Sequence, residues 1–164
     1  MNKNRIAGML ITAVTLLIVA GVLLGIDIWK KEGNVKQVTL TVDGETRESL
    51  SVSLTDFYPG ETREYVVNLI CRDEGSYEVS VKFEKKGDGN LDEYITAEIE
   101  TQGTRAGGKT LKEYFEGETL TRTCTAKAEE EIKLAIRYAM PSAVGNEAQK
   151  ASCGFDVVIT VIRK

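Results

Sequence analysis

Apolar and polar residues alternate along most of the chain after residue 37, and this period of two predicts a succession of β-strands. Successive side chains of a strand point to opposite faces, so each alternating segment has one buried face and one solvent face. In the last segment Val158 and Ile162 make the second face apolar as well, which predicts a central or covered strand. The alternating segments are residues 38–42, 50–54, 64–71, 77–84, 95–99, 120–126, 132–140 and 153–162.

Turn signals separate these segments, and one short helix interrupts them. Asp43 and Gly44 predict a tight hairpin between the first two strands, because Asp-Gly accepts positive φ values. Residues 101–109 contain three glycines and are predicted to be a loop. Thr110 and Glu113 have the spacing of a capping box, so a helix of one or two turns should begin there and cover one end of the core.

The element pattern predicts an all-β fold. Seven or eight short strands, turns between them and one short helix are typical of an antiparallel β-sandwich of the jelly-roll or immunoglobulin-like kind. The two sheets of such a fold each bury one face against the other. An open sandwich also leaves unpaired backbone groups at its edges, and edge-to-edge pairing is therefore a physical route to self-association.

A different pattern precedes the strands: a predominantly apolar run with no charged side chain begins at Ile6 and ends at Ile26. A run of roughly 20 apolar residues has the length needed to cross a membrane as a helix. Lys3 and Arg5 precede the run, which predicts a cytoplasmic N-terminus and an extracytoplasmic remainder. The chain then divides into residues 1–28 as a signal anchor or signal peptide, 29–36 as a spacer, and 37–164 as the β-sandwich domain.

Two interpretations of the apolar run remain open, an uncleaved signal anchor and a cleaved signal peptide. Cleaved signals usually have an apolar region of about 7–15 residues followed by small residues. The best small-residue site ends at Gly21, and cleavage there would leave the apolar sequence VLLGIDIW at the mature N-terminus. The length of the run and this apolar remnant favour the anchor, which holds the protein to the cell membrane; cleavage would secrete it.

Composition argues against an enzyme. The chain has no histidine, which removes most zinc chemistry and every histidine-based nucleophile or general base. No acid, base and nucleophile converge in the sequence, so neither a catalytic residue nor a cofactor is predicted. The net charge of −4 offers no attraction for nucleic acid.

One loop and three thiols are the remaining candidate sites. Asp88, Asn90 and Asp92 alternate like the opening ligands of a calcium loop, but Glu93 stands where such loops need glycine, so a solvated hairpin loop is the simpler interpretation. All three cysteines fall in the inward phase of predicted strands, which fits either small buried residues or one disulfide and an odd thiol. Sequence alone does not choose the pair. The cysteines are Cys71, Cys124 and Cys153.

Four segments resemble the TasA/camelysin family of exported Gram-positive surface proteins. They are YPGETREYVVNL (58–69), EGSYEVSVKF (74–83), LDEYITAEIE (91–100) with the glycine-rich loop and LKEYFEGE that follow, and VGNEAQKASCGFDVVITV (144–161). The resemblance implies an export segment, a jelly-roll-like sandwich and a structural role in biofilm-matrix fibres or a spore or cell-surface coat. Some family members carry a metallopeptidase label, which this chain does not support because it lacks HExxH.

The leading hypothesis is therefore a membrane-anchored or secreted structural surface protein that self-associates. The alternative is an extracellular module of the same fold that binds a glycan or another surface protein. A cluster of exposed aromatic side chains on one sheet face would favour the binding module.

Overall fold

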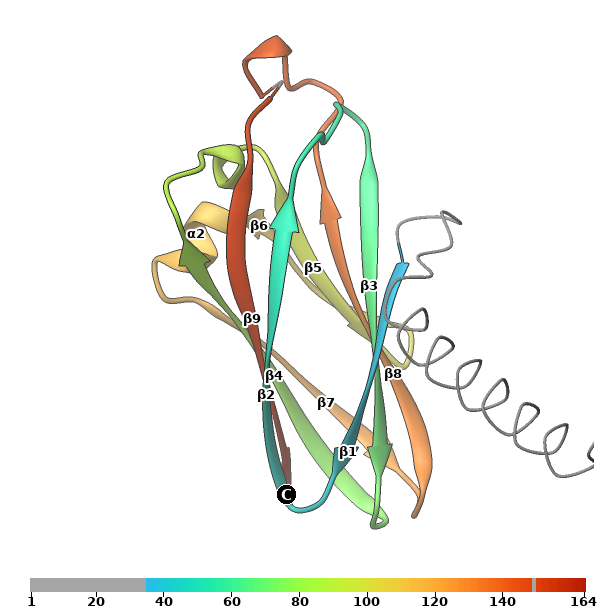
Figure 1. The fold of residues 1–164 in the computed structure, drawn as a ribbon. Helices are drawn as coiled ribbons and strands as arrows, with labels where there is room; N and C mark the ends of the chain where they lie inside the picture. Colours follow the sequence, from blue (N-terminus) through green and yellow to red (C-terminus); the bar gives the residue numbers. More distant parts are fainter. Residues whose placement is uncertain (1–34, 149) are drawn as a thin grey trace, which may run out of the picture. The chain divides into compact units, whose positions relative to one another are not determined.

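The computed structural model describes residues 35–148 and 150–164, which form two β-sheets and one short α-helix (Figure 1). The predicted membrane segment, Ile6 to Ile26, lies outside the described residues, as does nearly all of the predicted spacer. None of the helices in the described part is long and apolar enough to cross a membrane. The all-β prediction is confirmed for this part of the chain.

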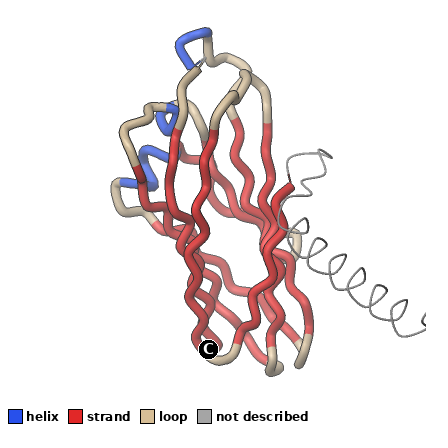
Figure 2. Tube along the Cα trace, viewed as in Figure 1, coloured by secondary structure: helices blue, strands red, loops and turns tan. Residues whose placement is uncertain are grey.

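The strands form a five-stranded and a four-stranded sheet, coloured red in Figure 2. The first sheet has the order β1 (Val35–Val42), β3 (Thr62–Cys71), β8 (Glu130–Ala139), β5 (Thr96–Thr101) and β6 (Thr104–Thr110). The second has the order β2 (Glu45–Leu54), β9 (Cys153–Arg163), β4 (Gly75–Lys86) and β7 (Thr119–Ala126). The helices are α2 (Leu111–Phe115) and the 3-10 turns η1 (Leu91–Glu93) and η2 (Asn146–Ala148).

The strand pairs are antiparallel with one exception among the described strands, the parallel pair of β1 and β3. A tight turn does follow β1, and Gly44 has a φ of 72° there. The predicted hairpin is nevertheless wrong, because β1 pairs with β3 while β2 crosses to the other sheet and pairs with β9. The apolar faces of β1 and β2 thus enter the same core from opposite layers.

The predicted loop at residues 101–109 is also wrong. Most of it forms β6, a strand in addition to the eight that the alternating pattern predicts. β6 is an edge strand with no alternating apolar face; Ala106 alone packs partly against the core. A β-bulge interrupts its pairing with β5, and Gly107 has a φ of 117° beside it. A Cβ at Gly107 would lie 2.6 Å from the carbonyl oxygen of Ala97, so this position requires glycine.

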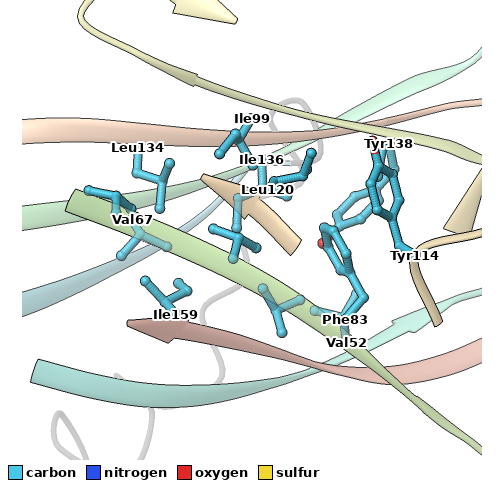
Figure 3. Close-up of a cluster of buried hydrophobic side chains, with 14 of the residues drawn as sticks. Val52, Val67, Phe83, Ile99, Tyr114, Leu120, Leu134, Ile136, Tyr138 and Ile159 are labelled. Carbon is cyan, nitrogen blue, oxygen red and sulfur yellow. The ribbon is translucent and has the colours of Figure 1, made fainter. Parts of the chain in front are cut away.

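The predicted inward-facing side chains do form the core (Figure 3). At one end Phe83, Tyr114, Tyr138 and Phe155 pack together, with ring centroids 5.4 Å apart for Phe83–Tyr114 and 5.5 Å for Tyr138–Phe155. β9 lies between β2 and β4, which confirms the central position expected from its two apolar faces.

The short helix α2 covers that end of the core, and its capping box is confirmed. The Glu113 backbone N–H donates to Thr110 Oγ1 at 3.3 Å, and the Thr110 N–H donates to Glu113 Oε2 at 2.8 Å. Leu111 and Tyr114 of the helix are buried in the core.

Candidate interaction surface at the β1–β2 edge

β1 and β2 lie at the edges of their sheets, and they contact each other across one side of the sandwich. Among the described strands each is hydrogen-bonded to a single neighbour, β3 for β1 and β9 for β2. On the open side of an edge strand, backbone N–H and C=O groups point outward without a ladder partner. This side of the domain therefore presents two open backbone edges.

A cavity of about 220 Å³ opens between these two strands, and we call it the β1–β2 groove. Val38 of β1 and residues 49–52 of β2 form its sides, and core residues such as Tyr65 and Tyr138 lie behind them. The residues lining it include no charged side chain. An apolar cavity of roughly 150 Å³ holds a benzene molecule, so the groove has room for one or two apolar side chains of a partner.

The stretch of β2 beside the groove lacks the features that usually protect an edge strand. Residues 49–54 read SLSVSL, with serines on the exposed face and Leu50, Val52 and Leu54 on the inner face. They contain no charge, proline or glycine, and uncharged segments of this kind pair readily with further strands. The β6 edge differs, because Arg105, Lys109 and the bulge interrupt it.

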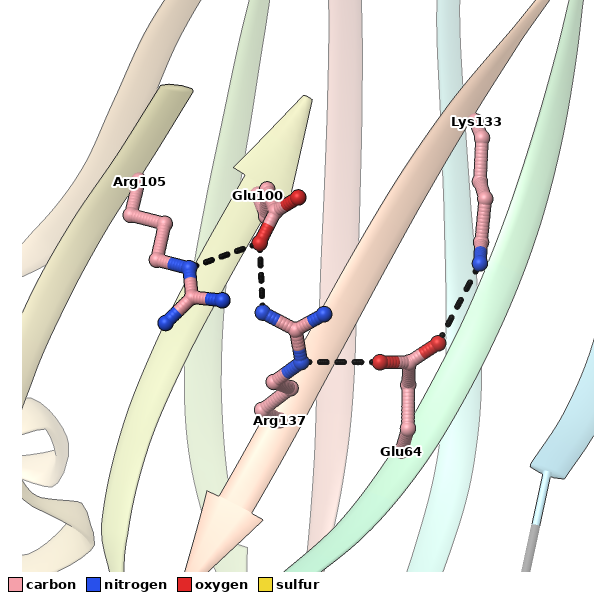
Figure 4. Close-up of polar contacts among 5 residues, drawn as sticks. All are labelled: Glu64, Glu100, Arg105, Lys133 and Arg137. Carbon is pink, nitrogen blue, oxygen red and sulfur yellow. Dashed lines mark hydrogen bonds and ion pairs between the residues drawn. The ribbon is translucent and has the colours of Figure 1, made fainter. Parts of the chain in front are cut away.

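The outer face of the five-stranded sheet carries a different feature, a row of five alternating charges that we call the charged ladder (Figure 4). Glu100 accepts from Arg105 Nε at 2.7 Å and from Arg137 Nη1 at 2.5 Å. Glu64 accepts from Arg137 Nε at 2.8 Å and from Lys133 Nζ at 3.3 Å. The ladder thereby links β6, β5, β8 and β3, and each of its two carboxylates is paired with two cations, so its role is to hold neighbouring strands together.

The ladder shifts the pKa values of its carboxylates. Partial burial alone would raise the pKa of Glu64, but hydrogen bonds from Arg137 and Lys133 outweigh it and the pKa is lowered. Hydrogen bonds from Arg105 and then Arg137 lower the pKa of Glu100. A carboxyl group with a lowered folded-state pKa stabilises the fold above its unfolded pKa, near 4.3, and loses that contribution as the pH falls through the folded value.

We therefore expect the free energy of unfolding to decrease as the pH falls below about 4.3, and Glu64→Gln to flatten this decrease. Urea denaturation of both proteins across this range measures it. Glu131→Gln is the matched control, since it removes an exposed carboxylate of β8 that lies outside the ladder. Identical pH profiles for Glu64→Gln and the wild type would contradict a stabilising role for the ladder.

The calcium candidates are not arranged as a ligand set. Asp92 is buried, and its two carboxylate oxygens accept from Lys85 Nζ at 3.0 and 2.9 Å. The side chains of Asp88 and Asn90 are exposed on the adjacent loop. No group of three or more acidic or cysteine side chains in the described residues is placed to hold a metal. A calcium ion at Asp92 would have to displace Lys85, so the structure gives Asp92 a place in an ion pair.

The three cysteines are buried, and each is a free thiol in the structure. Cys71 is the last residue of β3, Cys124 lies near the end of β7, and Cys153 is the first residue of β9. Burial raises the pKa of the Cys71 and Cys153 thiols to about 11, so both remain protonated at neutral pH. Protonated, buried thiols are poor nucleophiles.

Sequence reasoning had not located the β1–β2 groove. The uncharged run SLSVSL was visible, but only the strand order shows that it lies on an edge. The fold that carries the groove is a β-sandwich of a five-stranded and a four-stranded sheet with four edge strands, β1, β6, β2 and β7, among the described elements.

Comparison with known proteins adds little beyond this class of fold. No protein-family model matches the chain, and no curated protein matches its sequence. Similar solved structures include the periplasmic lysozyme inhibitor PliG of Aeromonas hydrophila, with 13% identity, a TM-score of 0.38, and coverage of 77% of this chain and 98% of the inhibitor. The pre-peptidase C-terminal domain of a Bacillus anthracis collagenase has 11% identity and a TM-score of 0.38, with 79% and 98% covered. The FLHE structure has 15% identity and a TM-score of 0.38, with 74% and 100% covered.

Proposed function

We propose that this chain is an exported, non-catalytic structural protein of the cell surface, whose β-sandwich self-associates through the β1–β2 edge. The observation that carries the proposal is that an apolar groove lies directly beside an uncharged segment of an edge strand, residues 49–54. A strand from a second copy would complete the backbone hydrogen bonds of β2. Its alternate side chains would enter the groove, as in other cases of β-strand addition.

The apolar run from Ile6 to Ile26 and the resemblance to the TasA/camelysin family support export and a matrix or coat role. The aromatic side chains favour strand pairing over glycan recognition. Tyr58 is the one large hydrophobic side chain that is exposed among the described residues, at 63%, so no exposed aromatic platform is formed there. A second function, capture of a strand from another surface protein, would use the same groove.

Residues 33–164 are suited to the first experiment, because Gly33–Lys164 form one compact unit. Analytical ultracentrifugation and electron microscopy at neutral and mildly acidic pH should detect concentration-dependent oligomers or fibres. A monomer under all conditions would contradict self-association, and a search for a protein partner of the groove would follow.

The mass of the mature chain from its own host shows whether the domain is tethered to the membrane or released. A chain that begins at Met1 is tethered to the membrane, and assembly is then confined to the cell surface. A chain that begins after Gly21 or Gly25 is released and free to form matrix fibres.

A further inference from the structure

The core of the sandwich is filled differently at its two ends. Several aromatic rings cluster at the end beneath α2, whereas at the other end, where β3 ends and β4 begins, the buried side chains include Cys71, Thr101, Cys124 and Ala126 together with the ring of Tyr77 (Figure 1). Two of these side chains are thiols on opposite sheets, Cys71 on β3 and Cys124 on β7.

The chain itself brings the two thiols to the same place. After Cys71 only residues 72–74 intervene before β4 begins in the other sheet at Gly75. Tyr77 of β4 is the direct cross-strand partner of Cys124. Directly opposed residues of antiparallel strands lie about 4.5–5.5 Å apart, so Cys124 lies close to the point where the chain crosses between the sheets.

Tyr77 connects the two cysteines. Its hydroxyl donates to the carbonyl oxygen of Asp73, two residues after Cys71, at 2.5 Å. The same hydroxyl acts on the Cys71 thiol, whose pKa it lowers against the larger effect of burial. Tyr77 is therefore the cross-strand neighbour of Cys124, and its side chain extends towards the residues that follow Cys71. Cys124 is in turn one of the groups that raise the pKa of the Cys71 thiol.

Cys153 is excluded from this pair by its position. It begins β9 opposite Leu54, whereas Arg163, ten residues along β9, lies opposite Tyr77. Ten residues of strand span roughly 33 Å. No disulfide reaches across such a distance, since bridged Cα atoms lie about 4.4–6.8 Å apart.

We propose that Cys71 and Cys124 form a disulfide between the two sheets of the exported protein, and that Cys153 remains a free thiol. Immunoglobulin domains join the facing strands of their sandwiches in the same manner. The bond forms by thiol–disulfide exchange. The two thiols lose two protons and two electrons, and a disulfide outside the cytoplasm accepts both and becomes two thiols. Because exchange needs a thiolate, and burial keeps the Cys71 thiol protonated, the bond forms while the core is still open during folding.

Peptide mapping of the full chain from its own host tests the proposal, with free thiols alkylated before lysis and no reductant used. The expected result is one peptide pair that contains Cys71 and Cys124, and an alkylated Cys153. Three alkylated cysteines, or a linked pair that includes Cys153, would overturn it. This result does not depend on self-association through the β1–β2 edge.

Thermal unfolding gives a second measurement on the purified full chain. Reduction should lower the unfolding temperature by roughly 10 °C in the wild type and in Cys153→Ser. Cys124→Ser should already unfold at the lower temperature and should not respond to reductant. An equal response of Cys124→Ser and the wild type would refute the pairing, and the mapping remains decisive if Cys124→Ser does not fold.

Discussion

Replacing Leu50 with aspartate should keep residues 33–164 monomeric under conditions in which the parent domain associates. Leu50 is only partly buried and lies at the side of the β1–β2 groove, so the variant should still fold. A docked strand would enclose the new carboxylate in an uncharged apolar groove, which costs several kcal/mol for an unpaired charge. Because each 1.4 kcal/mol is a factor of ten, association should weaken at least a hundredfold.

The matched control is Thr119→Asp, at an exposed position of β7 on the opposite edge of the same sheet. It adds the same charge, and its direct cross-strand partner is Lys82. Sedimentation velocity at several concentrations compares the parent, Leu50→Asp and Thr119→Asp. If Thr119→Asp abolishes association and Leu50→Asp does not, the interaction surface lies on the other side of the sandwich.

Local patterns in the sequence predict the elements whose stability is set by their own residues. The alternating runs were enough to predict the strands of the core, because inward positions must be apolar wherever a strand covers the core. The capping box at Thr110 and Glu113 was predictable for the same reason, since it satisfies backbone groups within a single turn.

The elements that sequence reasoning missed depend on distant partners. β6 has no apolar period because it covers little of the core, and its strand conformation is set by hydrogen bonds to β5. Gly44 has the positive φ expected of a hairpin turn, although β1 and β2 enter different sheets. Only pairing with β3 and β9 separates this arrangement from a hairpin, and that pairing is not encoded in the turn.

The candidate site follows the same rule. Residues 49–54 would be equally uncharged in a central strand, so their role as an open edge follows from the strand order alone. The cysteine pair is a similar case. The inward phase of Cys71 and Cys124 was visible in the sequence, but only the register with Tyr77 shows that they share one end of the core.

Replacing Phe83 with alanine should lower the free energy of unfolding by about 3–5 kcal/mol. Phe83 is buried and contacts Tyr114, Tyr138 and Phe155, with ring centroids 5.4, 6.3 and 6.0 Å away. Rings on both sheets and on α2 would lose packing around one cavity, and the backbone of β4, paired on both sides, holds that cavity open. Urea denaturation measures the loss.

Tyr58→Ala is the matched control for Phe83→Ala, because it also removes an aromatic ring but at an exposed position. Its effect should stay within about 0.5 kcal/mol. A loss below about 1 kcal/mol for Phe83→Ala would mean that the aromatic end of the core relaxes to fill the space. Tyr138 contacts Phe83 and lines the β1–β2 groove, so such relaxation would change the groove as well. The Phe83→Ala variant therefore also tests whether the shape of the groove depends on a fully packed core behind it. If the shape depends on that packing, self-association should weaken together with stability. Tyr58→Ala should leave both unchanged.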